Sequence, residues 1–188
     1  MSGKQTSLVR RRTRGTRLPR RGGGFTLLEM IAVMVIVSIL AAVAMPTLAQ
    51  LRDTQIGIAA RELARDLSWA RQRAVARGVN VWVLFDEDAN SYEIREEQLT
   101  QPGLGSAVPV NDPITGKPCQ RIFGSGEFSA VDITSVEFDD DQSVGFDWLG
   151  QPLHAGETAL SAQGRVTING THIVIVEVNT GHIWQVGP

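Results

Sequence analysis

The chain has 188 residues, with 18 Lys and Arg against 20 Asp and Glu, so its formal net charge is only −2. Of those 18 basic residues, eight lie in residues 1–24, which contain no acidic residue. The rest of the chain therefore has ten basic and 20 acidic residues, a balance of −10. An acidic body disfavours nucleic acid as a partner, because phosphates bind Lys and Arg. The single cysteine, Cys119, excludes an internal disulfide.

An apolar run, residues 25–48, follows the basic segment and contains one ionisable side chain, Glu29. As a helix it would span about 30–35 Å, enough to cross the hydrocarbon core of a bilayer. A carboxylate inside such a span is costly and requires a partner. Basic residues before the run and an acidic body after it predict a cytoplasmic N-terminus and a body on the other side of the membrane.

The contiguous sequence Gly24-Phe25-Thr26-Leu27-Leu28-Glu29 resembles the processing signal of type IV prepilins, the precursors of pilins and pseudopilins. The resemblance implies that a prepilin peptidase cuts after Gly24 and methylates Phe25, and that Glu29 assists assembly. Residues 1–24 would be the cleaved leader, longer than is usual in the family. A cationic amine in lipid is costly, and the Glu29 carboxylate of a neighbouring subunit would neutralise it.

An ordinary secretory signal is the alternative, because it also combines a basic region, an apolar run and a small-residue cleavage site. Ala42-Val43-Ala44 offers such a site, and Arg20-Arg21 faintly resembles a twin-arginine signal. The apolar run is longer than the typical core of about 7–15 residues, and it contains Glu29. Both features favour the prepilin interpretation.

The helix is expected to continue through Pro46 into a second, amphipathic part, residues 49–78. Small and apolar residues recur there at three- and four-residue spacing: Ile56, Ala59, Ala60, Leu63, Leu67, Ala70 and Ala74. This stripe predicts packing on a sheet, and Gly78 is the expected stop. The arginines on the other faces are interpreted as a solvated surface, with Arg61 and Arg65 near Glu62 and Asp66.

From residue 79 the apolar period changes to two, which predicts a hairpin with strands at 79–85 and 92–95. Its turn offers a weak metal candidate, because four residues fall at positions 1, 3, 5 and 12 of a calcium loop: Asp86, Asp88, Asn90 and Glu97. Ser91 stands where that loop needs glycine, and a strand enters where a helix should. A polar turn is therefore preferred, and no cofactor is expected.

Residues 98–127 are rich in Gly and Pro and are predicted to form a long irregular excursion. Further strands are expected at 135–138, 143–148, 165–168, 172–178 and 182–186, with an Asn169-Gly170 hairpin turn among their connections. Cys119 is interpreted as a small loop residue. The three histidines lack ligand spacing, and no catalytic set is evident, so the sequence does not predict an enzyme.

Several looser motifs resemble the GspH/FimT family of minor pseudopilins. They are Leu63-x3-Leu67-x2-Ala70-Arg71-x2-Ala74, the strand at 81–85, Phe146-x3-Gly150, and the late turn Asn179-Thr180-Gly181. The resemblance implies an α+β, type IV pilin-like fold, in which a long N-terminal helix packs on antiparallel β-sheet. The expected organisation is a leader at 1–24, a transmembrane and assembly helix at 25–48, an amphipathic helix at 49–78, and a periplasmic β-rich domain at 79–188.

Two functions follow from this resemblance. The first is a minor pseudopilin, a structural subunit of the periplasmic pseudopilus in type II protein secretion. The alternative is a FimT-like minor pilin of a type IV pilus, acting in assembly or DNA uptake. DNA-binding members use a basic patch near the final turn, whereas residues 181–188 contain no Lys or Arg. Secretion is therefore favoured. The implied partners are the prepilin peptidase, other pseudopilin or pilin subunits, the inner-membrane assembly platform and membrane lipid; nucleic acid is unlikely as a partner.

Overall fold

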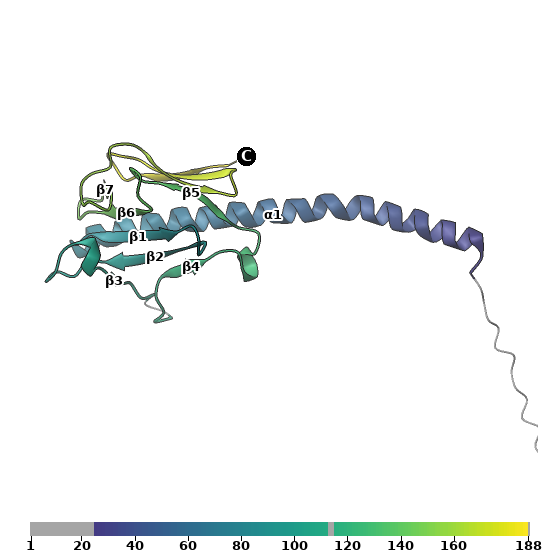
Figure 1. The fold of residues 1–188 in the computed structure, drawn as a ribbon, viewed down its shortest axis with the longest axis horizontal. Helices are drawn as coiled ribbons and strands as arrows, with labels where there is room; N and C mark the ends of the chain where they lie inside the picture. Colours follow the sequence, from purple (N-terminus) through teal and green to yellow (C-terminus); the bar gives the residue numbers. More distant parts are fainter. Residues whose placement is uncertain (1–24, 113–114, 188) are drawn as a thin grey trace, which may run out of the picture. The chain divides into compact units, whose positions relative to one another are not determined.

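The computed structural model describes residues 25–112 and 115–187. For residues 43–50 it describes the backbone and not the side chains. The chain divides into two compact units, Met1–Val43 and Ala44–Pro188. The described part consists of the long helix α1 followed by strands β1 to β10 (Figure 1). All of the strands belong to the second unit.

Helix α1 runs over Leu27–Arg77, a length of 51 residues. It continues through Pro46, as predicted. Gly78 ends the helix with φ +68°, and its N–H donates to the carbonyl of Ala74 at 2.9 Å. A left-handed residue at this position is the usual way to satisfy a terminal carbonyl, and glycine adopts it without strain. The predicted stop is confirmed.

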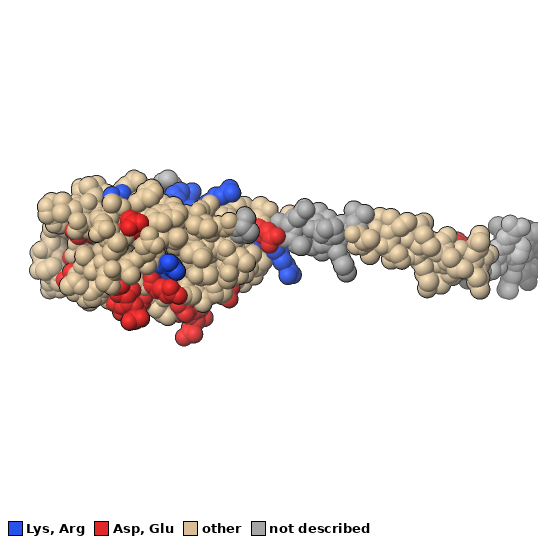
Figure 2. All heavy atoms as spheres, turned by 90° about the horizontal axis from the view of Figure 1, so that it is seen from above, with Lys and Arg blue, Asp and Glu red and all other residues tan. Residues whose placement is uncertain are grey.

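In the first unit, the apolar side chains of α1 are exposed on every face. The large apolar residues from Phe25 to Leu40 are 49–79% exposed, and Figure 2 shows this segment almost free of charged atoms. Among the described residues, no helix is both long enough and apolar enough to cross a membrane. The predicted span extends to residue 48, and the side chains of 43–48 lie outside the description.

In the second unit, α1 presents a buried stripe to the sheets. Every position of the predicted stripe is at most 8% exposed: Ile56, Ala59, Ala60, Leu63, Leu67, Ala70 and Ala74. These residues share one core cluster with side chains from both sheets, and α1 runs alongside both sheets in Figure 1. Burying a Leu side chain contributes roughly 1.5–3 kcal/mol, so Leu63 and Leu67 are strong anchors of this contact.

The first sheet has the order β3-β2-β1-β6-β7, and β4 pairs with β2 as well. Its strands are antiparallel, and β1 and β2 form the predicted hairpin, with Phe85 opposite Tyr92. The strand bounds are Val108–Pro109 (β3), Ser91–Glu96 (β2), Val81–Asp86 (β1), Ser143–Phe146 (β6), Pro152–Leu153 (β7) and Gln120–Ile122 (β4).

The excursion at 98–127 is more ordered than predicted. It contributes β3 and β4, which have two and three residues, and short 3-10 turns at Leu104–Ser106 and Gly126–Phe128. Strands this short carry no readable period, and both form by pairing with β2. The same excursion places Ala107 and Leu104 against Trp82, in a second small apolar cluster.

The second sheet is antiparallel with the order β10-β9-β8-β5, in which β8, β9 and β10 form a meander and β5 comes from earlier in the chain. Asn169 and Gly170 connect β8 to β9 with φ of +50° and +68°, the conformation that suits a two-residue hairpin turn. The predicted C-terminal meander is thus confirmed. The bounds are Ile183–Val186 (β10), His172–Val176 (β9), Gly164–Ile168 (β8) and Ile133–Glu137 (β5).

Candidate functional site

The start of α1 is capped by Thr26. Its hydroxyl oxygen accepts the N–H of Glu29 at 3.2 Å, and its carbonyl accepts the N–H of Met30 at 3.1 Å. Thr26 is therefore the N-cap and Glu29 the third helical residue, the Thr-x-x-Glu arrangement of a capping box. Sequence reasoning missed this role of Thr26, although the three-residue spacing to a glutamate was the signal. Gly24, the predicted cleavage position, lies outside the described residues.

The Glu29 carboxylate is exposed in the first turn of α1, and within the described residues it makes no ion pair. Phe25, the predicted methylated residue, precedes the helix and is 74% exposed. A negative charge is favoured at this end of a helix by the macrodipole. The arrangement offers a carboxylate to a cation from another molecule, in surroundings that are otherwise apolar.

The weak calcium candidate is not supported by the geometry. Glu97 follows β2 at the end opposite the turn, where it is buried and accepts hydrogen bonds from Trp82 Nε1 and Asn80 Nδ2, both at 3.1 Å. Asp86 instead accepts the N–H of Ala89 at 2.8 Å. In the described part of the chain, no group of three or more His, Cys, Asp or Glu is placed to hold a metal ion. The extended hairpin separates residues that a calcium loop would bring together.

The polar turn between β1 and β2 binds the edge of β5 instead. The Asn90 side chain donates to the carbonyl of Val131 and accepts the N–H of Ile133, both at 2.9 Å. Glu87 accepts the N–H of Val136 at 2.8 Å. These side chains connect the first sheet to the second.

Arg71 joins the two late motifs that the sequence singled out. Its Nε donates to the carbonyl of Gly150 at 3.0 Å. Gly181 packs against the same carbonyl so closely that a Cβ there would lie 2.4 Å from the oxygen. The sequence analysis placed the helix arginines on a solvated face, and for Arg71 that prediction is wrong. Arg71 is instead the centre of a contact that we call the Arg71 junction, formed by Arg71, Gly150 and Gly181.

A second polar network ties α1 to β2 and β4. Tyr92 donates its phenol to Asp66 at 2.8 Å and accepts from Arg121 Nε at 3.2 Å. Arg121 also pairs with Glu62 at 2.7 Å, whereas the predicted helix partner Arg65 lies 4.0 Å from Glu62 and 3.7 Å from Asp66. Burial, together with the Asp66 carboxylate, raises the pKa of Tyr92 well above its usual value. The two acids face β4, which the helix pattern alone could not reveal.

Two family models match the chain, one near its start and one over most of its body. Residues 19–45 match the prokaryotic N-terminal methylation motif, and residues 59–181 match the type II transport protein GspH. A methylation motif followed by a long helix packed on antiparallel sheets defines a pilin-like subunit. The GspH match covers more than half of the chain, so the chain belongs to the GspH family of type II transport proteins.

Two solved structures share the fold, and both are of the minor pseudopilin EpsH from the type II secretion system of Vibrio cholerae. One is 14% identical, with a TM-score of 0.51 over 71% of this chain and 98% of that one. The other is 12% identical, with a TM-score of 0.50 over 72% and 98%. No curated protein matches the chain. The predicted α+β, pilin-like fold is confirmed.

Proposed function

We propose that this chain acts as a minor pseudopilin, a structural subunit of the periplasmic pseudopilus of a type II protein secretion system. Its membership of the GspH family and its fold support this role. One observation carries the mechanism: the described part of α1 before residue 43 exposes apolar side chains on every face and carries one carboxylate, Glu29. Such a surface needs lipid or neighbouring helices to cover it.

Processing is the first step of this proposal. The prepilin peptidase removes residues 1–24 by cutting after Gly24, and Phe25 becomes the methylated N-terminal residue. The match to the N-terminal methylation motif over residues 19–45 supports this step. Phe25 and Thr26 precede the helix, so the new amine lies outside the first turn of α1.

Anchoring is the second step. Residues 25–48 cross the bacterial inner membrane once, with the N-terminus in the cytoplasm and the acidic body in the periplasm. The eight basic residues before Phe25 support this orientation by the positive-inside rule. Membrane lipid is thus the first partner of the exposed apolar surface.

Assembly is the third step. As the inner-membrane platform draws the subunit into the pseudopilus, Glu29 pairs with the N-terminal amine of a neighbouring subunit. Both charges lie among apolar side chains, where an unpaired charge is expensive and a pair is strongly favoured over its separated members. The exposed apolar face of α1 then packs against the helices of other pseudopilins.

Replacing Glu29 by Leu tests this mechanism. The variant should insert in the membrane and lose its leader, yet fail to co-purify with the other pseudopilins from cells with a complete secretion system. Ser38→Ala is a matched control, because the Ser38 hydroxyl donates to the carbonyl of Met34 on its own helix, at 2.7 Å. Mass spectrometry of the N-terminus checks cleavage and methylation in the two variants and in the unmodified protein. Normal incorporation of the Glu29→Leu protein would refute the proposed role of Glu29.

A further inference from the structure

The hairpin turn between β8 and β9 contains the only Asn-Gly dipeptide of the chain, Asn169-Gly170. The backbone nitrogen of the residue after an asparagine can attack the side-chain amide, and a glycine there has no side chain to hinder the approach. The same dipeptide suits a two-residue hairpin turn, which needs positive φ at both positions, here +50° and +68°. Favourable turn chemistry and susceptibility to deamidation therefore coincide at Asn169.

The Asn169 side-chain amide is bonded at both ends to the segment that leads into β5. Its Oδ1 accepts the N–H of Asp132, and its Nδ2 donates to the carbonyl of Ala130, both at 2.9 Å. The backbone N–H of Asn169 donates to the carbonyl of Asp132 at 2.8 Å. The amide therefore cannot rotate toward the Gly170 nitrogen without breaking both of its hydrogen bonds.

The Gly170 nitrogen, which would be the nucleophile, is held by Thr134. Its N–H donates to the Thr134 hydroxyl oxygen at 3.1 Å, and the same hydroxyl donates to the carbonyl of Thr167, also at 3.1 Å. Thr134 is the extra residue of β5 at a register shift in its pairing with β8. A bulge re-aims a side chain, and here the Thr134 side chain reaches the turn. Both reacting groups are thus held by hydrogen bonds to one segment, residues 130–134.

We infer that Asn169 is a deamidation site that the fold protects, so that it is modified in chains in which this part of the second sheet is open. In the reaction, the Gly170 nitrogen loses its proton to hydroxide and forms a bond to Asn169 Cγ. The bond from Cγ to the side-chain nitrogen breaks, and that nitrogen takes a proton from water and leaves as ammonia. Water then opens the succinimide to aspartate or isoaspartate, and no oxidant or reductant takes part.

The product no longer fits the contacts of Asn169. An aspartate has no N–H to donate to the Ala130 carbonyl and places a carboxylate oxygen against it, and an isoaspartate adds one carbon to the backbone of the turn. Two unsatisfied acceptors that face one another are unfavourable. A chain modified while open should therefore close less well, and Asn169→Asp should lower the midpoint of thermal unfolding.

The experiment measures deamidation of the full chain in detergent micelles, both folded and in urea, at one mildly alkaline pH and one temperature. Peptide mapping by mass spectrometry follows the asparagine, aspartate and isoaspartate forms of residue 169. The rate in urea divided by the rate in the folded protein is compared, because this ratio cancels any change in intrinsic reactivity. For the natural chain we expect a ratio of at least about ten, since the folded segment must open first.

Three variants assign this protection to the bulge. Thr134→Ala removes the hydroxyl that holds the Gly170 N–H, so the folded protein should deamidate about fivefold faster, which corresponds to about 1 kcal/mol. Thr134→Ser keeps a hydroxyl and should restore the natural ratio. Thr171→Ala is the matched control, because the Thr171 hydroxyl contacts His172 Nδ1 at 3.2 Å instead of the Gly170 N–H; it should also keep the natural ratio.

Two results would overturn the inference. One is an equal rate in the folded natural chain and in urea, and the other is a folded Thr134→Ala protein with the natural ratio. Circular dichroism shows whether each variant is folded, and if Thr134→Ala is not, the ratio for the natural chain still decides whether the fold protects Asn169. Neither result bears on the proposed function, which co-purification with other pseudopilins tests separately.

Discussion

At the scale of single residues, Thr26 and Glu29 have different roles at the start of α1: Thr26 caps the helix and Glu29 supplies the charge. The Thr26 hydroxyl accepts the backbone N–H of Glu29, and among the described residues the Glu29 carboxylate makes no ion pair. A capping residue reduces fraying of the first turn. Thr26 therefore determines where Glu29 is held, although Glu29 carries the charge.

We expect Thr26→Ala to destabilise the first turn by about 1 kcal/mol, the usual effect of removing an N-cap side chain. Thr26→Ser keeps the hydroxyl and should behave like the natural chain. Amide hydrogen exchange at Glu29 and Met30, measured on the mature protein in micelles, checks the difference. Equal exchange in both variants would mean that the cap contributes nothing to this turn.

Tyr92 gives a prediction about pH. The folded chain holds its phenol protonated above the ordinary pKa of 10.0, because the residue is buried beside Asp66. The unfolded chain loses that proton near pH 10, so the contribution of Tyr92 is complete below that pH and declines as the pH rises further. Tyr92→Phe should cost about 1–3 kcal/mol at neutral pH, and this difference should shrink above pH 10. Urea unfolding of both proteins at several pH values measures this difference in the free energy of unfolding. A difference that stays constant above pH 10 would contradict the raised pKa of Tyr92.

At the scale of elements, helix α1 is the best predicted part of the molecule. Its buried stripe follows from spacing alone, because one face of a helix repeats every 3.6 residues whatever it packs against. Strands β3 and β4 were missed for the opposite reason: each exists only through pairing with β2. The polar partners of α1 were missed in the same way, since Arg121 reaches Glu62 and Asp66 from a distant segment.

The Arg71 junction predicts how its glycines tolerate substitution. Gly181→Ala would place a Cβ 2.4 Å from the Gly150 carbonyl oxygen, whereas Gly170→Ala, at a similar positive φ, meets nothing within 4 Å. Gly170→Ala should therefore show only the conformational cost, about 1 kcal/mol. Gly181→Ala should lose at least a further 1–3 kcal/mol, roughly the cost of overpacking. Thermal unfolding compares the two, and equal losses would show that the junction is not tightly packed.

At the scale of the whole molecule, charge separates the two functions considered from the sequence. The chain after residue 24 has ten basic and 20 acidic residues, and none of the basic residues lies beyond Arg165. Strand β10 has no Lys or Arg, and its Trp184 stacks on His182, which precedes the strand, with ring centroids 5.7 Å apart. Such a surface releases few counterions from a nucleic acid.

We therefore expect the mature protein to show no specific binding of double-stranded DNA. Fluorescence anisotropy with a labelled duplex, at about 50 mM and about 200 mM salt, measures this. Micromolar binding that weakens steeply with salt would instead favour the DNA-uptake function. Arg165→Ala would then show whether the binding uses the C-terminal part of the chain, because Arg165 is the last basic residue.

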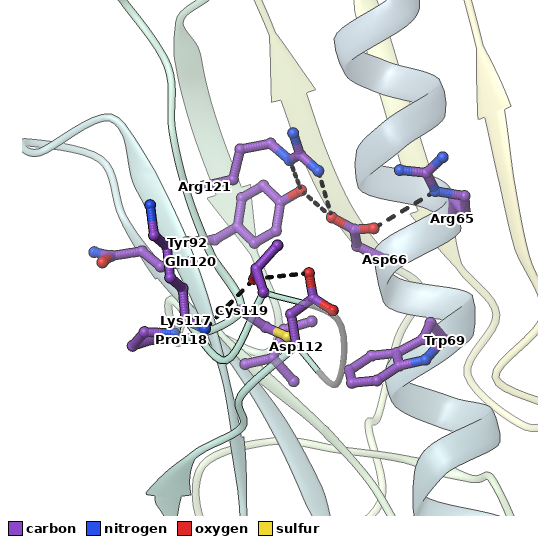
Figure 3. A pocket seen from close by; sticks show the side chains of 12 residues that line it. Arg65, Asp66, Trp69, Tyr92, Asp112, Lys117, Pro118, Cys119, Gln120 and Arg121 are labelled. Atoms are coloured by element: carbon purple, nitrogen blue, oxygen red, sulfur yellow. Dashed lines mark hydrogen bonds and ion pairs between the residues drawn. The ribbon is translucent and has the colours of Figure 1, made fainter.

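The sequence alone indicates the processing signal, because residues 24–29 form one contiguous motif and need no tertiary information. The match to the N-terminal methylation motif over residues 19–45 agrees with it, and the roles of Gly24, Phe25 and Glu29 stay predictions. A cavity of about 570 Å³ that Trp69 and Cys119 line (Figure 3) is different, because its wall combines α1, β2 and the segment before β4. Nothing in the spacing of those residues indicates that they meet. Sites built from distant segments become visible only when the chain is folded.

The turn between β1 and β2 has one more consequence, for solubility. An unprotected strand edge offers free backbone groups to any extended chain, and this is how folded proteins begin to polymerise by strand addition. Asn90 and Glu87 occupy the N–H groups of Ile133 and Val136 on β5, the outer strand of its sheet. Both N–H groups are therefore already bonded within the molecule. An extended chain that added to β5 would first have to displace the Asn90 and Glu87 side chains, so the contact that joins the two sheets also disfavours polymerisation through this edge.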